Sequence, residues 1–356
     1  MPSPANIPHN EVIMKRTGAV IFHPPAGSSE IERSVASARE ASACDLIQLL
    51  HPLVSKTIVV CSSDSSRAFQ AIGVSVQVVD EISSFHFGET LKQIIRDYAL
   101  DALVYFGSGS GTLLSKDQLA DMVGFTRREH VEALFNNYYS CDFAAFTDAA
   151  TLLLLPLPEK DNGLGFLLSD HGVACYSLPR TVESQFDLDT PIDLLLLKEA
   201  ARGGARLQAF LEQQHFDHPS LQQIGRLLVE RTALVYLVGR VSPVTWQAFE
   251  QQVACRTAGM IEGRGMKAYA DRQSPILANI FHKRGFAEFF RALENSADAA
   301  LSTPGHSLRA TAYFPLRRSV LPVTYSSCRS LETRFGLSLR SRQWRARSRF
   351  CLVAIR

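Results

Sequence analysis

The chain has 356 residues and a mass of 39.4 kDa, more than one compact core of typical size needs, so its length favours two units. Hydrophobic residues make up 46%, charged residues 20%, and the mean hydropathy is +0.01, values that exclude a disordered, collagenous or membrane-spanning class. The net charge of +2 combines unlike parts. Residues 301–356 hold eleven Arg and a single acid, Glu332, for a net +10, whereas residues 1–300 carry −8. The sequence therefore predicts an acidic body with a basic tail.

Neither a targeting segment nor a metal-binding cysteine pattern is visible in the sequence. Residues 1–16 contain no apolar stretch resembling a signal-peptide core, and no later segment reaches the roughly 18 apolar residues that span a bilayer. We therefore expect a cytoplasmic chain without a membrane partner. The seven cysteines lie far apart, with no CxxC pair and no zinc-type Cys/His spacing, which predicts reduced packing residues.

The first 200 residues alternate short apolar runs with amphipathic segments, a pattern typical of a parallel sheet covered by helices on both faces. We expect strands at 17–23, 56–62, 74–80 and 101–107. We expect a helix capped by Ser28 or Ser29 that runs through Leu53, helices at 64–72 and 88–99, and another that begins after Ser115 as N-cap. Further along, the sequence predicts a helix at 128–137, an apolar strand-like stretch at 144–157, a hairpin at 164–178 and a helix capped by Thr190.

The pattern changes at Gly203-Gly204, which we take as a domain boundary. Helices are expected at 204–214, 219–238, 243–256 and 276–293, with no strand, which predicts a smaller all-α region after the α/β unit. The expected organisation is a flexible N-terminus (1–16), an α/β domain (17–202), a helical domain (203–300) and an irregular Arg/Ser-rich tail (301–356).

Two carboxylates stand out at the end of the α/β unit. Asp187 and Asp189 are spaced i, i+2 in an extended segment, so both are expected on one side, directly before a helix N-terminus. Such a pair suits a hard divalent cation, and a hard cation suits a phosphate-bearing ligand. The alternative is that the two residues only cap and solvate the turn.

A glycine-rich turn follows the strand at 101–107. Gly107, Ser108, Gly109 and Gly111 lie between a buried strand and a helix, where bare backbone N–H groups can bind phosphate. The turn is not a P-loop, because no GKS or GKT follows, and it lacks the third glycine of the dinucleotide fingerprint. The alternative is a plain turn, and a dehydrogenase that binds NAD there is the less favoured third reading.

Taken in order, these segments resemble the nucleotidyltransferases of the nucleotide-diphospho-sugar transferase superfamily, most of all the molybdenum-cofactor guanylyltransferase and 2-phospholactate guanylyltransferase branch. Residues 113–116 (LLSK) match that branch's leucine-leucine-threonine-proline helix start. Residues 187–194 (DLDTPIDL) match its closing motif Asp-Ile-Asp-Thr-Pro-Glu-Asp-Leu. The likeness covers about residues 17–200.

The resemblance implies a three-layer α/β sandwich that binds a nucleoside triphosphate and Mg²⁺. A phosphate or hydroxyl of a small-molecule acceptor would attack the α-phosphate and release pyrophosphate. Asp187 and Asp189 would be metal ligands, the 107–111 turn would lie near the nucleotide, and Asn162 and Gly163 would contact substrate. The resemblance assigns no catalytic residue, base preference or acceptor.

Two features depart from the family's pattern. The first strand runs into residues 23–29 (HPPAGSS) instead of a glycine-rich loop with Arg and Lys, and Arg33 and Arg39 lie inside the following helix. The turn after the fourth strand has lost the family's Asp, which predicts weaker Mg²⁺ binding. An inactive nucleotide-binding or regulatory protein with the same fold is therefore the alternative to an enzyme.

The remaining segments give weaker signals. Arg264, between Gly263 and Gly265, could contact an anionic ligand or be a solvated charge in a turn between helices. The basic tail has no helical or strand period, so we do not expect nucleic-acid binding. Its composition is typical of the out-of-register translation of a GC-rich gene. The alternative is an unstructured terminus. The sequence leaves a homo-oligomer open.

Overall fold

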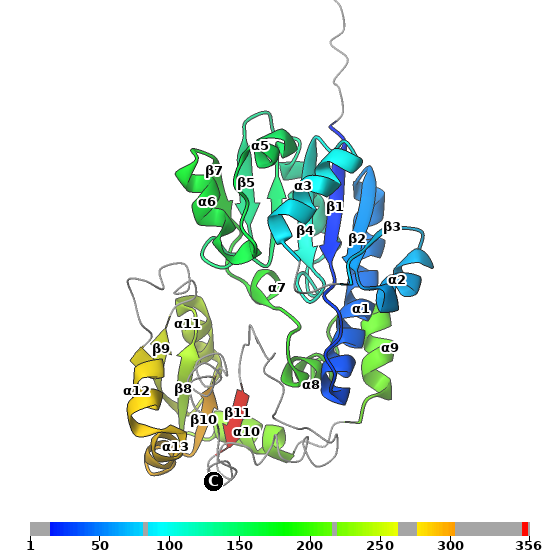
Figure 1. The fold of residues 1–356 in the computed structure, drawn as a ribbon. Helices are drawn as coiled ribbons and strands as arrows, with labels where there is room; N and C mark the ends of the chain where they lie inside the picture. The colour runs from blue at the N-terminus through cyan, green and yellow to red at the C-terminus, as the bar shows by residue number, and fades with distance from the viewer. Residues whose placement is uncertain (1–14, 81–84, 216–218, 263–275, 303–350, 355–356) are drawn as a thin grey trace, which may run out of the picture.

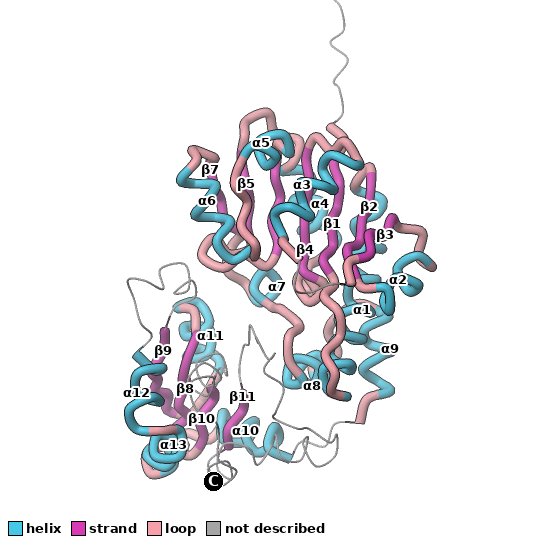
Figure 2. The backbone as a smooth tube through the Cα atoms, viewed as in Figure 1, coloured by secondary structure: helices cyan, strands magenta, loops and turns pink. Residues whose placement is uncertain are grey.

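The computed structural model of the chain describes residues 15–80, 85–215, 219–262, 276–302 and 351–354. Within them the strands form two sheets, one of seven strands and one of four (Figure 1). Figure 2 shows the strands of each sheet flanked by helices from the same part of the chain. None of the helices in the described ranges is long and apolar enough to cross a membrane.

The seven-stranded sheet has the order β3-β2-β1-β4-β6-β5-β7. Its strands are β1 (Thr17–Phe22), β2 (Lys56–Cys61), β3 (Ser75–Val78), β4 (Ala102–Gly107), β5 (Glu132–Phe135), β6 (Phe143–Phe146) and β7 (Ala174–Ser177). β1 pairs in parallel with β2 and β4, and β2 with β3. β6 runs antiparallel to β4 and to β5, and β5 pairs in parallel with β7. The sheet is therefore mostly parallel, as the alternating pattern predicts.

Helices cover both faces of this sheet. The helices on the two faces are α1 (Glu30–Leu50), α2 (Ser63–Gln70), α3 (Phe87–Asp97), α4 (Lys116–Phe125), α5 (Ala149–Leu154) and α6 (Leu164–Asp170). The short helix α7 (Val182–Gln185) follows β7, and α8 (Pro191–Glu199) and α9 (Ala205–Gln213) pack against α1. Side chains of α1, α2 and α4 join one core with Ile21 and Val104, and side chains of α3, α5 and α6 join the other with Val20 and Leu103. Successive residues of one strand thus face opposite layers, which confirms the three-layer α/β sandwich.

Three expectations for the first unit are wrong in detail. Residues 128–137 do not form a helix but contain the short strand β5, and the stretch 144–157 divides into β6 and α5. The hairpin expected at 164–178 is instead α6 followed by β7. Gly172, with a φ of +80°, supplies the turn that ends α6 and starts β7, so a signal interpreted as a hairpin turn is a helix C-terminus.

The all-α region expected after residue 203 is also wrong. Of the helices after residue 203 in the described part of the chain, α9 packs against α1 and so belongs to the first unit. The later helices are α10 (Pro219–Val229), α11 (Pro243–Gln252), α12 (Ile276–Arg284) and α13 (Phe286–Glu294), and the strands are β8 (Leu234–Arg240), β9 (Arg256–Glu262), β10 (Ala299–Ser302) and β11 (Cys351–Ala354). The sheet order is β11-β10-β8-β9, with β8 parallel to β9 and β10 and with β11 antiparallel.

The alternation of side chains along β8 explains how this sheet is buried. Val235 and Leu237 join a core with α10 and α11, whereas Tyr236 and Val238 join a core with α12 and α13. The second unit is therefore also a sheet covered on both faces. The tail expected to be irregular contributes β11 and the end of β10, while residues 303–350 and Arg264 lie outside the described residues.

Candidate functional site

The site lies at the carboxyl edge of the seven-stranded sheet. Because β1, β4, β5 and β7 run in the same direction, their carboxyl ends share one edge. The segments that follow them there are 23–29, 108–115, 136–142 and 178–190. In open α/β sheets, ligands bind outside this edge.

The glycine-rich turn and the acidic segment meet at this edge. The amide of Leu188 donates to the carbonyl oxygen of Gly109 at 2.8 Å, and Ser110 and Asp187 form an isolated antiparallel bridge. A Cβ on Gly109 would lie 2.5 Å from the Leu188 carbonyl oxygen and 2.9 Å from Oδ1 of Asp187. Only glycine allows this approach. The structure therefore joins two segments that the sequence singled out separately.

The turn itself is held by the surrounding backbone. The amide of Gly107 donates to the Asp142 carbonyl at 3.1 Å, that of Ser108 to the Phe22 carbonyl at 2.9 Å, and that of Ser110 to the Gly107 carbonyl at 2.9 Å. These three amides are engaged within the fold. A phosphate at the turn would therefore depend on other donors than these three.

Asp189 lies against Arg39 of α1. The Nη2 of Arg39 forms an ion pair with Oδ1 of Asp189, and its Nε donates to the carbonyl oxygen of Leu188 at 2.6 Å. The two side chains are only 21% and 12% exposed. Arg39 thus fixes the acidic segment to α1 by two contacts with neighbouring residues, which a planar guanidinium suits better than an ammonium group.

Asp193 caps the N-terminus of α8. Its Oδ2 accepts hydrogen bonds from the amides of Asp189 (3.0 Å) and Thr190 (2.7 Å) and from the Thr190 hydroxyl (2.8 Å). Pro191 occupies the first turn, as the sequence predicts for this helix. The motif DLDTPIDL therefore builds a helix start that presents Asp187 and Asp189 in front of it.

Two buried polar side chains at the same edge lack hydrogen-bond partners in the described part of the chain: Nδ1 of His23 and Oγ of Ser108. The register that pairs Phe22 with Gly107 places these residues side by side just past the ends of β1 and β4. Burial, and to a lesser extent the charge of Arg39, lowers the pKa of His23 to about 4, so the imidazole is neutral near pH 7.

The loop after β5 connects the edge to the remaining predicted site residues. Within it, Asn136 donates to Oδ2 of Asp142 at 2.9 Å and accepts from the Asp142 amide at 2.9 Å. Nε2 of Gln185, two residues before Asp187, donates to the Asn136 carbonyl at 2.7 Å. The loop therefore fixes the chain that leads to Asp187.

Asn162 and Gly163 are connected to that loop through Ser140. Ser140 donates to Oδ1 of Asn162 at 2.9 Å, and Gly163 ends a short 3-10 helix (Asp161–Gly163) that leads into α6. No atom comes within 4 Å of a Cβ built on Gly163, so nothing there demands glycine for packing. The structure links these residues to the site through residues 136–142 and not by direct contact with Asp187.

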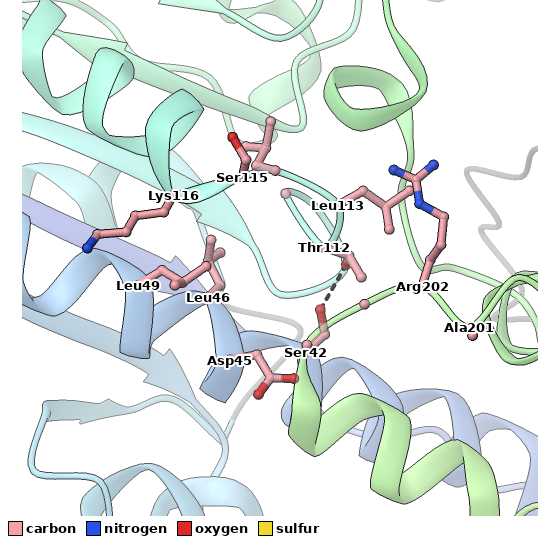
Figure 3. A pocket seen from close by; sticks show the side chains of 14 residues that line it. Ser42, Asp45, Leu46, Leu49, Thr112, Leu113, Ser115, Lys116, Ala201 and Arg202 are labelled. Atoms are coloured by element: carbon pink, nitrogen blue, oxygen red, sulfur yellow. Dashed lines mark hydrogen bonds between the residues drawn. The ribbon is translucent and has the colours of Figure 1, made fainter.

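A cavity of about 410 Å³ opens beside the glycine-rich turn (Figure 3). It lies between α1, the start of α4 and the turn before α9, and Gly111 belongs to both the cavity and the glycine-rich turn. Oγ of Ser42 lies 2.8 Å from Oγ1 of Thr112 on its wall. The carboxylate of Asp45 is engaged by the amides of Arg206 and Leu207 at 3.0 Å.

The carboxylates at this edge do not suit a divalent cation as they stand. Asp189 is already neutralised by Arg39, and Asp187 is 6% exposed with Oδ1 close to the glycine-rich turn. No group of three or more His, Cys, Asp or Glu side chains suited to a metal occurs among the described residues. Mg²⁺ demands near-octahedral oxygen ligation. With Arg39 in place, the residues present do not fit the two-carboxylate Mg²⁺ site that the resemblance implies.

Four side chains of this edge escaped the sequence reasoning as site residues: His23, Arg39, Asn136 and Asp142. In the sequence Arg39 is only one residue of a helical pattern, and its partner is 150 positions away, so no local pattern marks the pair. The other three do carry a signal: they are polar residues that directly follow the apolar strands at 17–22 and 132–135 or directly precede the strand at 143–146.

Comparison with known proteins gives partial likenesses only. No protein-family model matches the chain, and no curated protein matches it by sequence. A putative nucleotide-diphospho-sugar transferase from Desulfovibrio desulfuricans G20 is 15% identical with a TM-score of 0.39, covering 56% of this chain and 95% of that chain. A nucleotidyl transferase from Methanothermobacter is 16% identical with a TM-score of 0.42, covering 57% and 100%.

A third similar structure, from Mycobacterium tuberculosis H37Rv, is described as a complex with manganese. It is 12% identical with a TM-score of 0.36, covering 52% of this chain and 99% of that chain. At these low TM-scores and identities, the likenesses assign neither an activity nor a ligand to this chain. The functional argument therefore rests on the chain's own residues.

Proposed function

We propose that the seven-stranded unit is a nucleotidyltransferase-like unit that binds a nucleoside triphosphate at its carboxyl edge. The observation that carries this proposal is the direct contact between the glycine-rich turn and the acidic segment, made by the Leu188–Gly109 hydrogen bond. The acidic segment carries one of the two motifs through which the sequence resembles the guanylyltransferase branch of the superfamily, and the glycine-rich turn leads directly into the other, residues 113–116. Their meeting at the carboxyl edge is what a nucleotide site in this architecture requires.

In the enzyme form of the proposal, the unit transfers a nucleotidyl group. An oxygen of a phosphate- or hydroxyl-bearing small molecule attacks the α-phosphorus, a new P–O bond forms, and the bond from the α-phosphorus to the bridging oxygen breaks. Pyrophosphate leaves with that electron pair, and a hydroxyl acceptor also loses its proton. Gly107, Ser108, Gly109 and Gly111 would lie near the nucleotide, with Asn162 and Gly163 toward the acceptor. A cytoplasmic location stays a prediction.

The second candidate is a protein that binds nucleotide without turnover. The Arg39–Asp189 ion pair favours it, because an arginine takes one of the two carboxylates that the resemblance assigns to the metal. Metal dependence of nucleotide binding separates the two candidates. An enzyme of the implied kind needs the cation to offset charge on the phosphates, whereas a binding protein with its own fixed charges does not.

The experiment is a calorimetric or thermal-shift titration of the full chain with GTP, CTP, ATP and UTP, each with and without Mg²⁺. Binding that needs Mg²⁺ and disappears in Asp187→Ala supports the enzyme. Binding that is indifferent to the metal supports the second candidate. Asp117→Ala, which removes an exposed acid in the first turn of α4, is the matched control and should bind as the unaltered chain does. No saturable binding of any of the four nucleotides would contradict both.

A further inference from the structure

The position of Arg39 carries an inference beyond nucleotide binding. Its guanidinium contacts the Asp189 carboxylate and the Leu188 carbonyl oxygen together, the latter at 2.6 Å. Both side chains of the ion pair are mostly buried. A partly buried ion pair supported by a second hydrogen bond is much stronger than an exposed one, because solvent screens it less.

The same carboxylate is one of the pair that a divalent cation would need. Asp187 and Asp189 flank Leu188, so a cation held by both would lie next to the residue whose carbonyl Arg39 binds. An arginine side chain keeps its positive charge at any pH at which the protein folds. A divalent cation and the guanidinium would therefore repel each other, and the two cannot share Asp189 without one moving away.

We propose that Arg39 is an internal counter-ion that occupies Asp189 in place of a divalent cation, so that the chain alone binds no such cation at Asp187 and Asp189. Removing the charge of Arg39 takes this counter-ion away from Asp189 and lets a divalent cation compete for the carboxylates of the sequence motif. The inference rests on the proposed function for the role of this edge. Its test uses the metal alone, so its failure is distinct from a failure of nucleotide binding.

The probe is Mn²⁺ without nucleotide, titrated into the full chain, with free Mn²⁺ followed by electron paramagnetic resonance. Arg39→Met should bind Mn²⁺ at least about tenfold more tightly than the unaltered chain, because the guanidinium charge then no longer competes with the cation for Asp189. The double variant Arg39→Met/Asp189→Asn should lose that gain. Arg33→Met removes an exposed arginine from the first turn of the same helix and should leave Mn²⁺ binding unchanged.

A second variant guards against loss of the fold. Arg39→Gln keeps a donor for the Leu188 carbonyl but carries no charge, and it should show the same gain in Mn²⁺ affinity. Melting curves of each variant establish that it is folded. The proposal is overturned if the unaltered chain binds Mn²⁺ as tightly as Arg39→Met or Arg39→Gln, or if the gain persists in the double variant.

Discussion

The amide of Leu188 donates to the carbonyl oxygen of Gly109 at 2.8 Å, and this bond holds the acidic segment against the glycine-rich turn. On either side of it, Asp187 pairs with Ser110 and the Leu188 carbonyl accepts from Arg39. The contact thus ties together α1, the end of β4 and the segment that begins α8. Substitutions around it should separate the structural roles of these residues from any role in binding.

Gly109→Ala is expected to destabilise the first unit. The new methyl group would lie 2.5 Å from the Leu188 carbonyl oxygen, a backbone atom that cannot move without disturbing the contact. Overpacking of this kind costs about 1–3 kcal/mol. Chemical denaturation measures the free energy of unfolding. Gly124→Ala is the control, because nothing lies within 4 Å of its Cβ in helix α4, and it should stabilise by about 0.5–1 kcal/mol. Equal effects at both sites would contradict the steric argument.

Asp193→Ala should lower the free energy of unfolding by about 1–3 kcal/mol, because it leaves the Asp189 and Thr190 amides at the start of α8 without their acceptor. Asp193→Asn keeps one oxygen acceptor and should lose less. The comparison is made by denaturant titration. The exposed Asp117 at the start of α4 provides the control, and Asp117→Ala should cost less than about 1 kcal/mol. A loss at Asp117 as large as that at Asp193 would show that burial of the cap is irrelevant.

Local signals explain which parts of the fold could be predicted. Ser29 and Glu32 at α1, and Ser115 and Gln118 at α4, form capping boxes that are readable over four residues. The sequence does not predict β8, because its seven residues, LVYLVGR, follow a helical segment without a Gly or Pro between them. A short apolar run in that position fits the end of a buried helix as well as a strand.

The candidate site likewise has a part that local sequence signals predict and a part that they do not. Thr190 and Asp193 were recognisable as a helix start because they are three residues apart. The Arg39–Asp189 ion pair joins residues 150 positions apart, and only the packing of α1 beside α8 brings them together. The spacing of Asp187 and Asp189 therefore predicts two carboxylates on one segment, but it cannot show that an arginine already holds one of them.

His23 should make the stability of the first unit depend on pH. Its pKa is lowered from 6.5 to about 4, first by burial and then by the charge of Arg39. Between pH 6.5 and about pH 4, His23 takes up a proton in the unfolded chain but not in the native chain. Stability from this group is therefore complete above about pH 6.5 and falls as the pH drops toward 4, by at most about 3 kcal/mol.

Denaturant titrations between pH 4 and 7 test this dependence. His23→Gln should flatten the loss of stability in that window, whereas His130→Gln, at an exposed position, should leave it unchanged. A pH profile for His23→Gln as steep as that of the unaltered chain would show that other groups cause the dependence.

Cys44 and Cys61 should resist alkylation in the native chain. Burial raises the pKa of each thiol to about 11, with neighbouring charges as smaller causes, and both side chains are almost fully inaccessible. Since the thiolate is the reactive form, iodoacetamide at pH 8 should label these two residues far more slowly than in denaturant. Peptide mass spectrometry measures the labelled fraction at each position. Labelling at similar rates in native and denatured chains would contradict their burial.

Removal of β11 tests whether the end of the basic tail belongs to the four-stranded sheet. β11 pairs antiparallel with β10, from Ala299 with Ala354 to Ser302 with Cys351, so deleting residues 351–356 turns β10 into an edge strand. Amide hydrogen exchange should then accelerate in β10, while β1 and β4 of the other sheet keep their protection. If the tail end is only incidental to the fold, exchange in β10 will be the same in the shortened and full chains, and the interpretation of residues 301–356 as irregular will hold for β11 as well.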